Sequence, residues 1–361
     1  MRRRSADLPD FPWDLLEPAK ATAGSHPDGL VDLSMGTPVD PVPAPVQAAL
    51  AAAADAPGYP LTAGTTALRD AISAWVTAAC DAAPGFGVLP TIGSKELVAW
   101  LPTLLGIGQG DTVVIPPVCY PTYEVGARLA GATVVRSDSL TALGPAPVRL
   151  VWLNSPGNPT GRVLPEAHLR KVVAWARERD AVVVNDECYL TLGWEATPVS
   201  ILSVCGGSYD RVLAVHSLSK RSNLAGYRAG FVAGDPGLVE ELLAVRKHAG
   251  MMVPTPVQAA MVAALANESE VDGQRSRYRA RRALLRPALE KAGFTVEHSE
   301  AGLYLWATRG EECWSTVDWF AARGIVVCPG TFYGPTGARH VRLALTATDD
   351  RVESAAGRLA G

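Results

Sequence analysis

The sequence predicts an α/β fold in which a large domain with a mostly parallel, doubly wound sheet is joined to a smaller α+β domain. Short runs of β-branched residues alternate with helical patterns through the middle of the chain, which is typical of such a sheet. After about residue 250 the pattern changes to a charged helix and short strands. A chain of 361 residues, 48% apolar and 19% charged, is long enough to bury one large core and a second lobe.

The expected elements follow one another in a regular order. The first forty residues are rich in proline, and we expect an irregular, extended arm there. Residues 88–92 have the composition of a strand, and the helix after them places four leucines on one face. Residues 166–179 carry apolar side chains at helical spacing between two strands. The other expected strands are residues 112–116, 133–136, 150–154, 181–186 and 212–217.

The last part of the chain predicts a second domain. We expect a charged helix over residues 275–291 and short strands over residues 303–307 and 341–345. No repeat of fixed period and no linker rich in proline or glycine separates the parts. The predicted division is an N-terminal arm and part of the small domain over residues 1–40, a large domain over 41–250, and a small C-terminal domain over 251–361.

Charge and cysteine content restrict the class of partner. Acidic residues outnumber basic ones by 36 to 33, so the chain lacks the basic field that nucleic acid or an anionic membrane requires. The six cysteines show no CxxC spacing, so we expect reduced, buried thiols in the cytoplasm rather than disulfides or a metal site. Residues 2–4 are arginines, but no apolar stretch follows them, so neither export nor a membrane span is expected. Small molecules and other protein chains are the expected partners.

Polar residues follow three predicted strands at the points where the strands end. Asn158, Asp186 and Lys220 each lie at or shortly after such an end. Ligands of open parallel sheets bind at the carboxyl ends of the strands, so these residues predict a single site. One such strand end alone is a weak signal, but three together favour a binding or catalytic function.

The position of Arg228 agrees with this site. It follows Ser217 by eleven residues, and residues 231–233 then have the composition of another strand. A parallel crossover with its helix needs roughly ten to twelve residues, so we expect this strand to be antiparallel. Its beginning, with Arg228, then returns to the edge of the sheet that holds Lys220.

The start of the helix after residues 88–92 predicts a phosphate site. Free backbone N–H groups at a helix N-terminus bind phosphate, which here points to Ser94 and Lys95. The glycines at 106, 108 and 110 come at the end of that helix and before a strand, so they lack the context of a dinucleotide-binding motif. We interpret them as a turn.

These stretches together resemble those of a known family. The sequence is similar to the fold-type I, pyridoxal-phosphate (PLP)-dependent aminotransferases of class I/II, in order and spacing from residue 30 to residue 350. The resemblance implies a fold-type I PLP-dependent transferase fold, pyridoxal 5'-phosphate as the cofactor, and amino acids and 2-oxo acids as the substrates. The stretches that carry it are residues 154–161 (NSPGNPTG), 185–189 (NDECY), 217–228 (SLSKRSNLAGYR) and 340–343 (HVRL).

The resemblance assigns roles to the residues at the strand ends. Lys220 corresponds to the lysine that forms the Schiff base with PLP and moves the Cα proton of the substrate. Asp186 corresponds to the aspartate that pairs with the pyridine nitrogen and keeps the ring protonated as an electron sink. Asn158 and Tyr189 correspond to the donors to the phenolic oxygen of the ring. An asparagine before Pro159 is also a common turn residue, and the two roles are compatible.

Other residues correspond to the groups that hold the ring and its phosphate. Tyr120 resembles the aromatic residue that stacks on the ring, although a core tyrosine would look the same in sequence. Ser217, Arg228 and the backbone N–H groups of Ser94 and Lys95 would bind the phosphate, with the arginine as a planar fork. We expect the Lys95 side chain to be solvated at the helix start.

The resemblance also implies substrate-binding residues and a shared site. Arg342 resembles the arginine that holds the substrate α-carboxylate through two hydrogen bonds, and Gly36 would bring its backbone near the same carboxylate. Tyr59 resembles the tyrosine that reaches the phosphate in the neighbouring subunit. The expected assembly is therefore a homodimer with shared active sites, without a metal ion.

Three classes of function fit parts of this pattern. A transaminase is favoured over a PLP-dependent lyase, which would use the same Lys220 and Asp186, and over a DNA-binding regulator, which the charge balance disfavours. The chain further resembles the actinobacterial N-succinyldiaminopimelate aminotransferases in residues 11–14, 26–29, 36–41 and 246–256.

This second resemblance implies a substrate. The implied reaction is N-succinyl-LL-2,6-diaminopimelate:2-oxoglutarate aminotransfer in lysine and diaminopimelate biosynthesis. A general class I/II aminotransferase for aspartate, alanine or aromatic amino acids is the alternative. Both substrates of the implied reaction carry distal negative charge, so a second cationic patch is required. Arg246, Lys247, the N-terminal arm and the partner subunit are its candidate sources.

Overall fold

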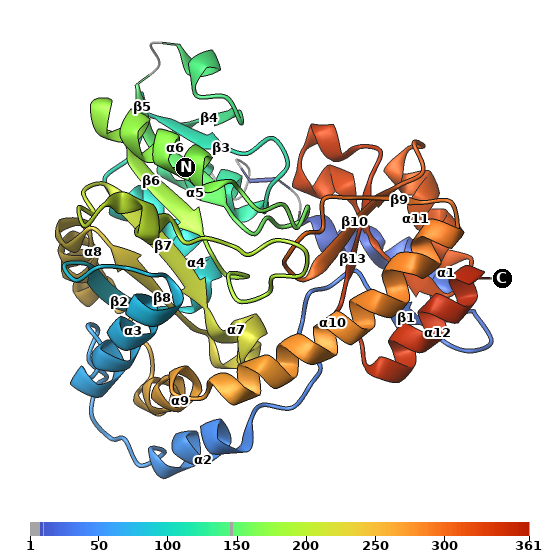
Figure 1. Cartoon of the computed structure of the whole chain (residues 1–361), viewed down its shortest axis with the longest axis horizontal. Helices are drawn as coiled ribbons and strands as arrows, with labels where there is room; N and C mark the ends of the chain where they lie inside the picture. The colour runs from blue at the N-terminus through green and yellow to red at the C-terminus, as the bar shows by residue number, and fades with distance from the viewer. Residues whose placement is uncertain (1–7, 10, 145–146, 361) are drawn as a thin grey trace, which may run out of the picture.

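The computed structural model describes residues 8–9, 11–144 and 147–360, so the arginines at residues 2–4 lie outside the described part of the chain. A large domain on a seven-stranded sheet lies beside a smaller domain, as Figure 1 shows. The predicted α/β fold is confirmed. The large sheet has the order β2-β8-β7-β6-β5-β3-β4. Its strands are β2 (Gly87–Ile92), β3 (Thr112–Ile115), β4 (Thr133–Arg136), β5 (Val148–Asn154), β6 (Val182–Asp186), β7 (Val212–Ser217) and β8 (Ala229–Gly234).

Strand β8 is the exception in a parallel sheet. Strands β3 to β7 pair in parallel, whereas β8 runs antiparallel to both β7 and β2. The register pairs Ser217 with Gly230, so Arg228, which precedes β8, lies at the edge of the sheet where β7 ends. The predicted antiparallel strand is confirmed. The physical reason is that the connection from Ser217 is too short for a parallel crossover.

Helices cover both faces of the large sheet. One face packs against α3 (Thr66–Ala79), α6 (Glu166–Glu178) and α9 (Thr255–Leu265), and the other against α4 (Gly93–Leu104), α5 (Thr122–Ala130) and α8 (Pro236–Ala249). Alternate strand residues point to opposite faces, so Val183 and Val184 belong to different cores. No helix in the described ranges is both long and apolar enough to cross a membrane.

The smaller domain has its own antiparallel sheet in the order β12-β13-β10-β9. The charged helix and the two strands expected there are present, although the helix begins at Glu268 rather than at residue 275. The strands are β9 (Thr295–Glu297), β10 (Tyr304–Thr308), β12 (Cys328–Pro329) and β13 (Val341–Ala344). The helices that pack beside them are α10 (Glu268–Lys291), α11 (Cys313–Ala321) and α12 (Asp349–Ala360).

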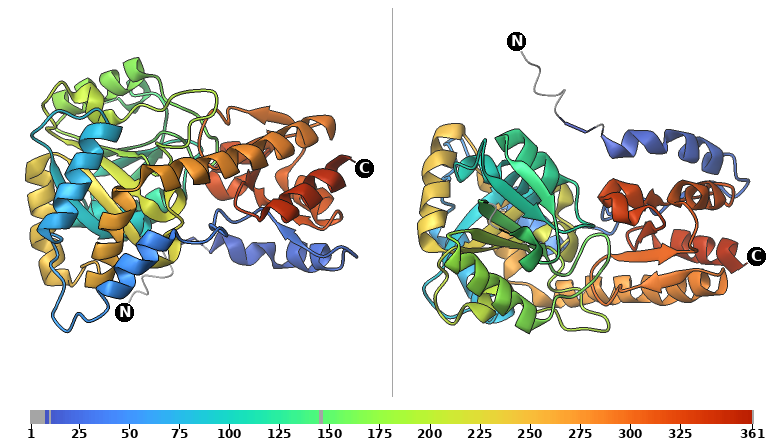
Figure 2. Two further views of the ribbon diagram at one scale, coloured as in Figure 1. Left: turned by 60° about the horizontal axis from the view of Figure 1, so that its bottom comes forward. Right: turned by 90° about the horizontal axis from the view of Figure 1, so that it is seen from above.

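Residues 33–43 have no regular secondary structure, as expected, but residues 12–24 differ from the extended arm that the prolines suggested. Residues Pro12–Leu16 form a 3-10 helix and Glu17–Gly24 form α1, with Pro18 in the first turn. Proline at that position lacks only an N–H group that the helix does not use, so it begins a helix rather than breaking one. The apolar side chains of α1 join the core of the small domain, and β1 (Val31–Asp32) pairs with β11 (Ile325–Val326). Figure 2 shows α1 alongside the small domain.

The packing of α9 bears on the division into domains. Its buried residues lie in the core beneath the large sheet, together with Val253. We therefore propose a boundary after α9 rather than at residue 250. Helix α2 (Ala44–Ala52) contacts α9, so the beginning and the end of the large domain lie side by side (Figure 1).

Candidate active site

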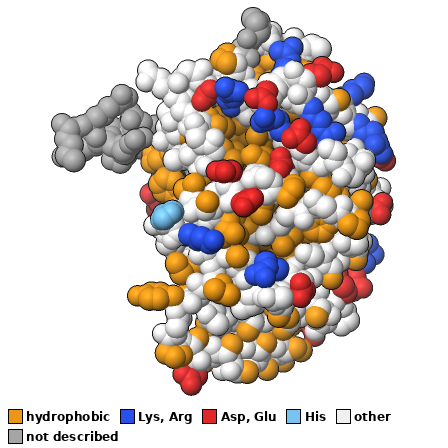
Figure 3. Space-filling view, turned by 90° about the vertical axis from the view of Figure 1, so that its left-hand side faces the viewer, with side chains coloured by type: hydrophobic (Ala, Val, Ile, Leu, Met, Phe, Trp, Pro, Cys, Tyr) orange, Lys and Arg blue, Asp and Glu red, His pale blue; other side chains and the backbone are white. Residues whose placement is uncertain are grey.

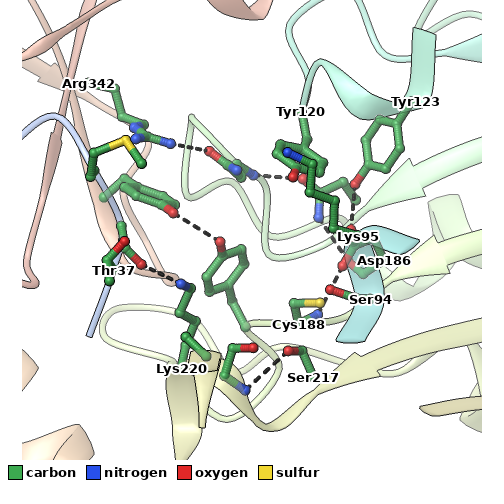
Figure 4. A pocket seen from close by; sticks show the side chains of 18 of the residues that line it. Thr37, Ser94, Lys95, Tyr120, Tyr123, Asp186, Cys188, Ser217, Lys220 and Arg342 are labelled. Carbon is green, nitrogen blue, oxygen red and sulfur yellow. Dashed lines mark hydrogen bonds between the residues drawn. The ribbon is translucent and has the colours of Figure 1, made fainter. Parts of the chain in front are cut away.

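The predicted site residues meet at one cavity between the two domains. It lies at the carboxyl ends of β5, β6 and β7, and its volume is about 290 Å³. Figure 4 shows side chains that line it. The side chain of Tyr59 is 97% exposed and does not line it. All the other predicted site residues do: Gly36, Ser94, Lys95, Tyr120, Asn158, Asp186, Tyr189, Ser217, Lys220, Arg228 and Arg342. Segments far apart in the sequence converge here because parallel strands end at the same edge of a sheet.

Lys220 lies on α7 (Leu218–Arg221), the short helix that follows β7. The Ser217 hydroxyl caps this helix by accepting a hydrogen bond from the Ser219 N–H at 3.1 Å. The Lys220 ammonium donates to the backbone carbonyl of Gly36, so the lysine reaches from the large domain to the N-terminal segment. Burial lowers the pKa of Lys220 to about 8, which leaves part of the amine neutral and nucleophilic near neutral pH.

Asp186 is the last residue of β6, and its carboxylate is buried beside the cavity. It accepts hydrogen bonds from the Tyr123 hydroxyl at 2.8 Å and from the Cys188 backbone N–H at 3.2 Å. Burial raises the pKa of Asp186, and no cationic side chain of the described residues forms an ion pair with it. A buried carboxylate without a cation is costly, so a cationic atom of a ligand would stabilise this one.

The N-terminus of α4 faces the cavity through Ser94 and Lys95. No side chain of the described residues caps the first N–H groups of this helix, which leaves them available to bind an anion. The Arg228 guanidinium lies against Gly93, where a Cβ atom would come within 2.5 Å of its Nη2 atom. Burial and the charge of Arg228 lower the pKa of Lys95. An arginine beside an uncapped helix end favours a phosphate there.

Arg342 enters the cavity from β13 in the small domain. Its buried guanidinium donates to the Asn158 side-chain oxygen at 3.1 Å and to the Ser34 carbonyl. Its Nε has no hydrogen-bond partner among the residues that the structure describes. The guanidinium carbon lies 4.0 Å from the centroid of the Tyr304 ring and 5.0 Å from that of Tyr333. These contacts hold a planar donor in one orientation, which is what recognition of a carboxylate requires.

The remaining predicted residues form the wall between these two ends. The hydroxyl of Tyr189 lies 3.1 Å from that of Tyr304. The backbone N–H of Asn158 donates to the Asn154 side chain at 2.7 Å, which fixes the turn after β5. The Tyr120 ring packs edge-on against Tyr123, with 5.8 Å between the ring centroids. An amide, a phenol and an aromatic face thus border the space between Asp186 and Arg342.

The two basic residues considered for a distal carboxylate lie elsewhere. Arg246 is fully buried, and its guanidinium forms two hydrogen bonds with the Glu96 carboxylate at 3.0 and 3.1 Å. Lys247 follows it on α8 and does not line the cavity either. The hypothesis that these two side chains bind substrate in their own chain is therefore wrong, because α8 covers the face of the sheet and not its strand ends.

Several cavity residues had no signal in the sequence. Tyr123 and Tyr304 lie in a helix and a strand where an aromatic residue is normally part of the core, and only the fold shows their contacts with Asp186 and Arg342. Phe11 and Trp13 of the N-terminal segment also line the cavity. The motif at residues 11–14 contributed to the resemblance, but nothing in it indicated a place at the site.

The cavity matches the chemistry of pyridoxal phosphate at both ends. A phosphate dianion would balance Arg228 and accept hydrogen bonds from the N–H groups at the uncapped start of α4. A protonated pyridine nitrogen would supply the cation that Asp186 lacks. Lys220 provides the amine that combines with the aldehyde of this cofactor. The residues present therefore fit the group.

The fold and this cavity define a PLP-dependent enzyme of fold type I. The chain belongs to the aminotransferase class I and II family, whose model matches residues 28–359. It is 64% identical to the probable aminotransferase Rv1178 of Mycobacterium tuberculosis, over 98% of this chain and 86% of that protein. It is 60% identical to the 4-dedimethylamino-4-oxo-anhydrotetracycline transaminase OxyQ of Streptomyces rimosus, over 98% and 99% of the two chains.

Solved structures agree with this family. The probable N-succinyldiaminopimelate aminotransferase of Thermus thermophilus superimposes with a TM-score of 0.87 at 29% identity, over 96% of this chain and 99% of that one. The expected activity and cofactor are confirmed at the level of the family: the protein is a transaminase that uses PLP, with an amino acid and an oxo acid as substrates.

Proposed function

We propose that this transaminase moves the amino group of glutamate to the 2-oxo precursor of N-succinyl-LL-2,6-diaminopimelate, which yields this diamine and 2-oxoglutarate in lysine and diaminopimelate biosynthesis. The observation that carries the proposal is the buried, oriented guanidinium of Arg342 at the end of the cavity opposite Asp186. It suits the α-carboxylate that both substrates carry at the reacting carbon. The name of the Thermus relative supports the choice of the succinylated diamine.

The proposed roles follow from the geometry. Bound PLP supplies an electron-withdrawing ring that stabilises negative charge at the substrate Cα. Asp186 holds the proton on the ring nitrogen, and Lys220, whose pKa burial lowers to about 8, takes and returns the Cα proton. Asn158 and Tyr189 would hold the ring through its phenolic oxygen, and Tyr120 would supply an aromatic surface for it to stack on.

The two ends of the site bind anions in this proposal. The N–H groups at the start of α4, with Ser217 and Arg228, hold the phosphate. Arg342 and the backbone at Gly36 hold the carboxylate. The distal carboxylate of either substrate would then extend toward the Lys95 side chain and the N-terminal segment. A location in the cytoplasm remains a prediction, to which the six unpaired cysteines of the fold are suited.

A second candidate substrate is a larger, more apolar ketone. The relative that shares 60% of its residues with this chain is named for an anhydrotetracycline ketone. Phe11 and Trp13 line the same cavity, and Phe11 is 54% exposed, so aromatic surface is available to a polycyclic substrate. The enzyme would aminate such a substrate after glutamate has converted the bound cofactor to its amino form.

A screen of half-reactions separates these candidates. Glutamate and N-succinyl-LL-2,6-diaminopimelate are each expected to convert the cofactor of the holoenzyme to its amino form, seen as loss of the visible absorbance within seconds. Aspartate, alanine and phenylalanine serve as matched donors. Failure of both expected donors, with rapid conversion by phenylalanine, would leave only the family assignment. A polycyclic ketone that restores the absorbance of the glutamate-treated enzyme, where the succinylated oxo acid does not, would favour the second candidate.

We further propose a homodimer in which Tyr59 reaches the phosphate site of the partner subunit. Tyr59 and Leu61, in the loop between α2 and α3, are 97% and 60% exposed. Hydrophobic side chains also cover much of the face of the large domain that points away from the small domain (Figure 3). An interface between two copies would remove such apolar surface from water.

Mixed dimers of two variants, each inactive or weakened by itself, test whether the active site is shared between subunits. Co-expressed Lys220→Ala and Tyr59→Phe chains are expected to regain activity above the mean of the two parents, because one site of the mixed dimer then has both residues intact. The matched control combines Lys220→Ala with Arg228→Ala, two residues of the same cavity, and should regain none. A fully active monomer by light scattering, or equal results from both mixtures, would contradict the proposal.

A further inference from the structure

Tyr304 occupies the junction between the carboxylate-binding and cofactor-binding ends of the cavity. It lies on β10, where it pairs with Ala344, while Trp306 pairs with Arg342. Tyr304 and Arg342 are therefore diagonal neighbours on the same face of the sheet, which places the guanidinium 4.0 Å from the ring centroid. The side chain is only 4% exposed, so the sheet holds it in this place.

The hydroxyl of Tyr304 connects the two domains. It lies 3.1 Å from the hydroxyl of Tyr189, which belongs to the loop after β6 in the large domain. The two rings meet edge to face, with 5.7 Å between their centroids at 76°. A Cβ atom at Gly36 would collide with the same hydroxyl, so the segment that accepts the Lys220 hydrogen bond also packs on Tyr304.

Either hydroxyl could donate the Tyr189–Tyr304 hydrogen bond, and the surroundings favour Tyr304 as the donor. The positive charge of Arg342 over the Tyr304 ring withdraws electron density from that phenol, which makes Tyr304 the better donor of the two. If Tyr304 donates to the Tyr189 oxygen, the Tyr189 hydrogen stays free to point into the cavity. Hydrogen bonds in such a chain strengthen one another, so Tyr189 also becomes a stronger donor.

We infer that Tyr304 is a positioning residue that links the Arg342 carboxylate site to Tyr189, by orienting the guanidinium with its ring and polarising Tyr189 with its hydroxyl. The inference rests on the proposed role of Tyr189 as donor to the phenolic oxygen of the cofactor. It adds a link between the two binding events: a carboxylate that partly neutralises Arg342 weakens the donor strength of Tyr304, and hence that of Tyr189.

Titration of the visible absorbance of the bound cofactor tests the link. A weaker donor at the phenolic oxygen stabilises its anionic form less, so Tyr304→Phe holoenzyme is expected to titrate about 0.3–1 pH unit higher than the unchanged protein. Its KM for glutamate should also rise severalfold. The phenylalanine ring still packs against Arg342, but without the hydrogen bond to Tyr189 it is held less firmly and orients the guanidinium less well. Binding of succinate, a simple dicarboxylate probe, should shift the titration in the unchanged protein and shift it less in Tyr304→Phe.

Tyr333→Phe is the matched control. Tyr333 is equally buried, its ring also lies near Arg342 at 5.0 Å, and its hydroxyl donates to Cys328 Sγ at 3.3 Å rather than to Tyr189. Loss of a buried hydroxyl alone would change the melting temperature of both variants similarly, but only Tyr304→Phe should shift the titration. Equal shifts in the two variants would overturn the inference.

The variant Tyr189→Phe separates failure of the inference from failure of the proposed function. If Tyr189 is the donor to the phenolic oxygen, Tyr189→Phe raises the midpoint pH of the titration by more than Tyr304→Phe does. The double variant then has the same midpoint as Tyr189→Phe alone. A shift for Tyr189→Phe with none for Tyr304→Phe contradicts the link only. No shift for Tyr189→Phe overturns the proposed role of Tyr189 and the link with it.

Discussion

Lys220→Ala is expected to lose all measurable turnover together with the visible absorbance of the bound cofactor. Alanine has no amine to combine with the cofactor aldehyde and none to move the Cα proton, and a positioned acid–base group alone contributes about 10²–10⁴-fold to a rate. The fold should survive the change, because the substitution removes a single hydrogen bond, the one from the Lys220 amine to the backbone carbonyl of Gly36. Absorbance spectra and initial rates of the purified holoenzyme measure both losses.

A second lysine in the same cavity provides the control. Lys95→Ala should keep the visible absorbance, because the proposed phosphate contact at this position comes from the backbone N–H. Only the neutral form of Lys220 is nucleophilic, so the rate at which apoenzyme takes up PLP should increase as the pH rises through about 8, the pKa of this lysine. A coloured and active Lys220→Ala protein, or a colourless Lys95→Ala protein, would show that the two lysines were assigned the wrong way round.

Asp186→Asn is expected to bind PLP and to lose most of its rate. The amide keeps the size of the carboxylate and can still accept from Tyr123, but it cannot stabilise a proton on the ring nitrogen, so the electron sink is lost. Removal of one preorganised charge stabiliser typically lowers kcat by about 10²–10³-fold. Tyr123→Phe, which leaves the carboxylate in place, should lower kcat much less. A near-normal rate for Asp186→Asn would mean that another group holds the ring nitrogen.

The same substitution should stabilise the protein without cofactor. Burial raises the pKa of Asp186 in the folded state, so the charged carboxylate destabilises the apoenzyme at neutral pH. That cost is fully present above the raised pKa and disappears as the pH falls below the ordinary pKa of aspartate. The melting temperature of apo Asp186→Asn should therefore exceed that of the unchanged apoenzyme at pH 7, by a margin that shrinks toward acidic pH. Equal melting temperatures at pH 7 would contradict this account of the carboxylate.

The fold was predictable where local pattern and topology agree. The β-branched runs that became β5, β6 and β7 are buried on both faces, which is why they read as continuous apolar strands. The short connection after Ser217 was enough to predict the antiparallel β8. Pro12 and Pro18 were misread, because a proline in the first turn of a helix looks the same in sequence as one in an extended arm.

The sequence by itself determined which residues could form the site. Asn158, Asp186, Ser217 and Lys220 come at strand ends, and parallel strands end at the same edge, so their convergence follows from chain order alone. Tertiary structure decided the rest, because contacts between distant segments depend on how the domains pack. Only packing places Tyr304 between Arg342 and Tyr189, and only packing pairs Arg246 with Glu96 instead of a substrate. A side chain at a strand end has a direction that local structure sets, whereas the partner of a buried aromatic or cationic side chain is set by the opposing surface.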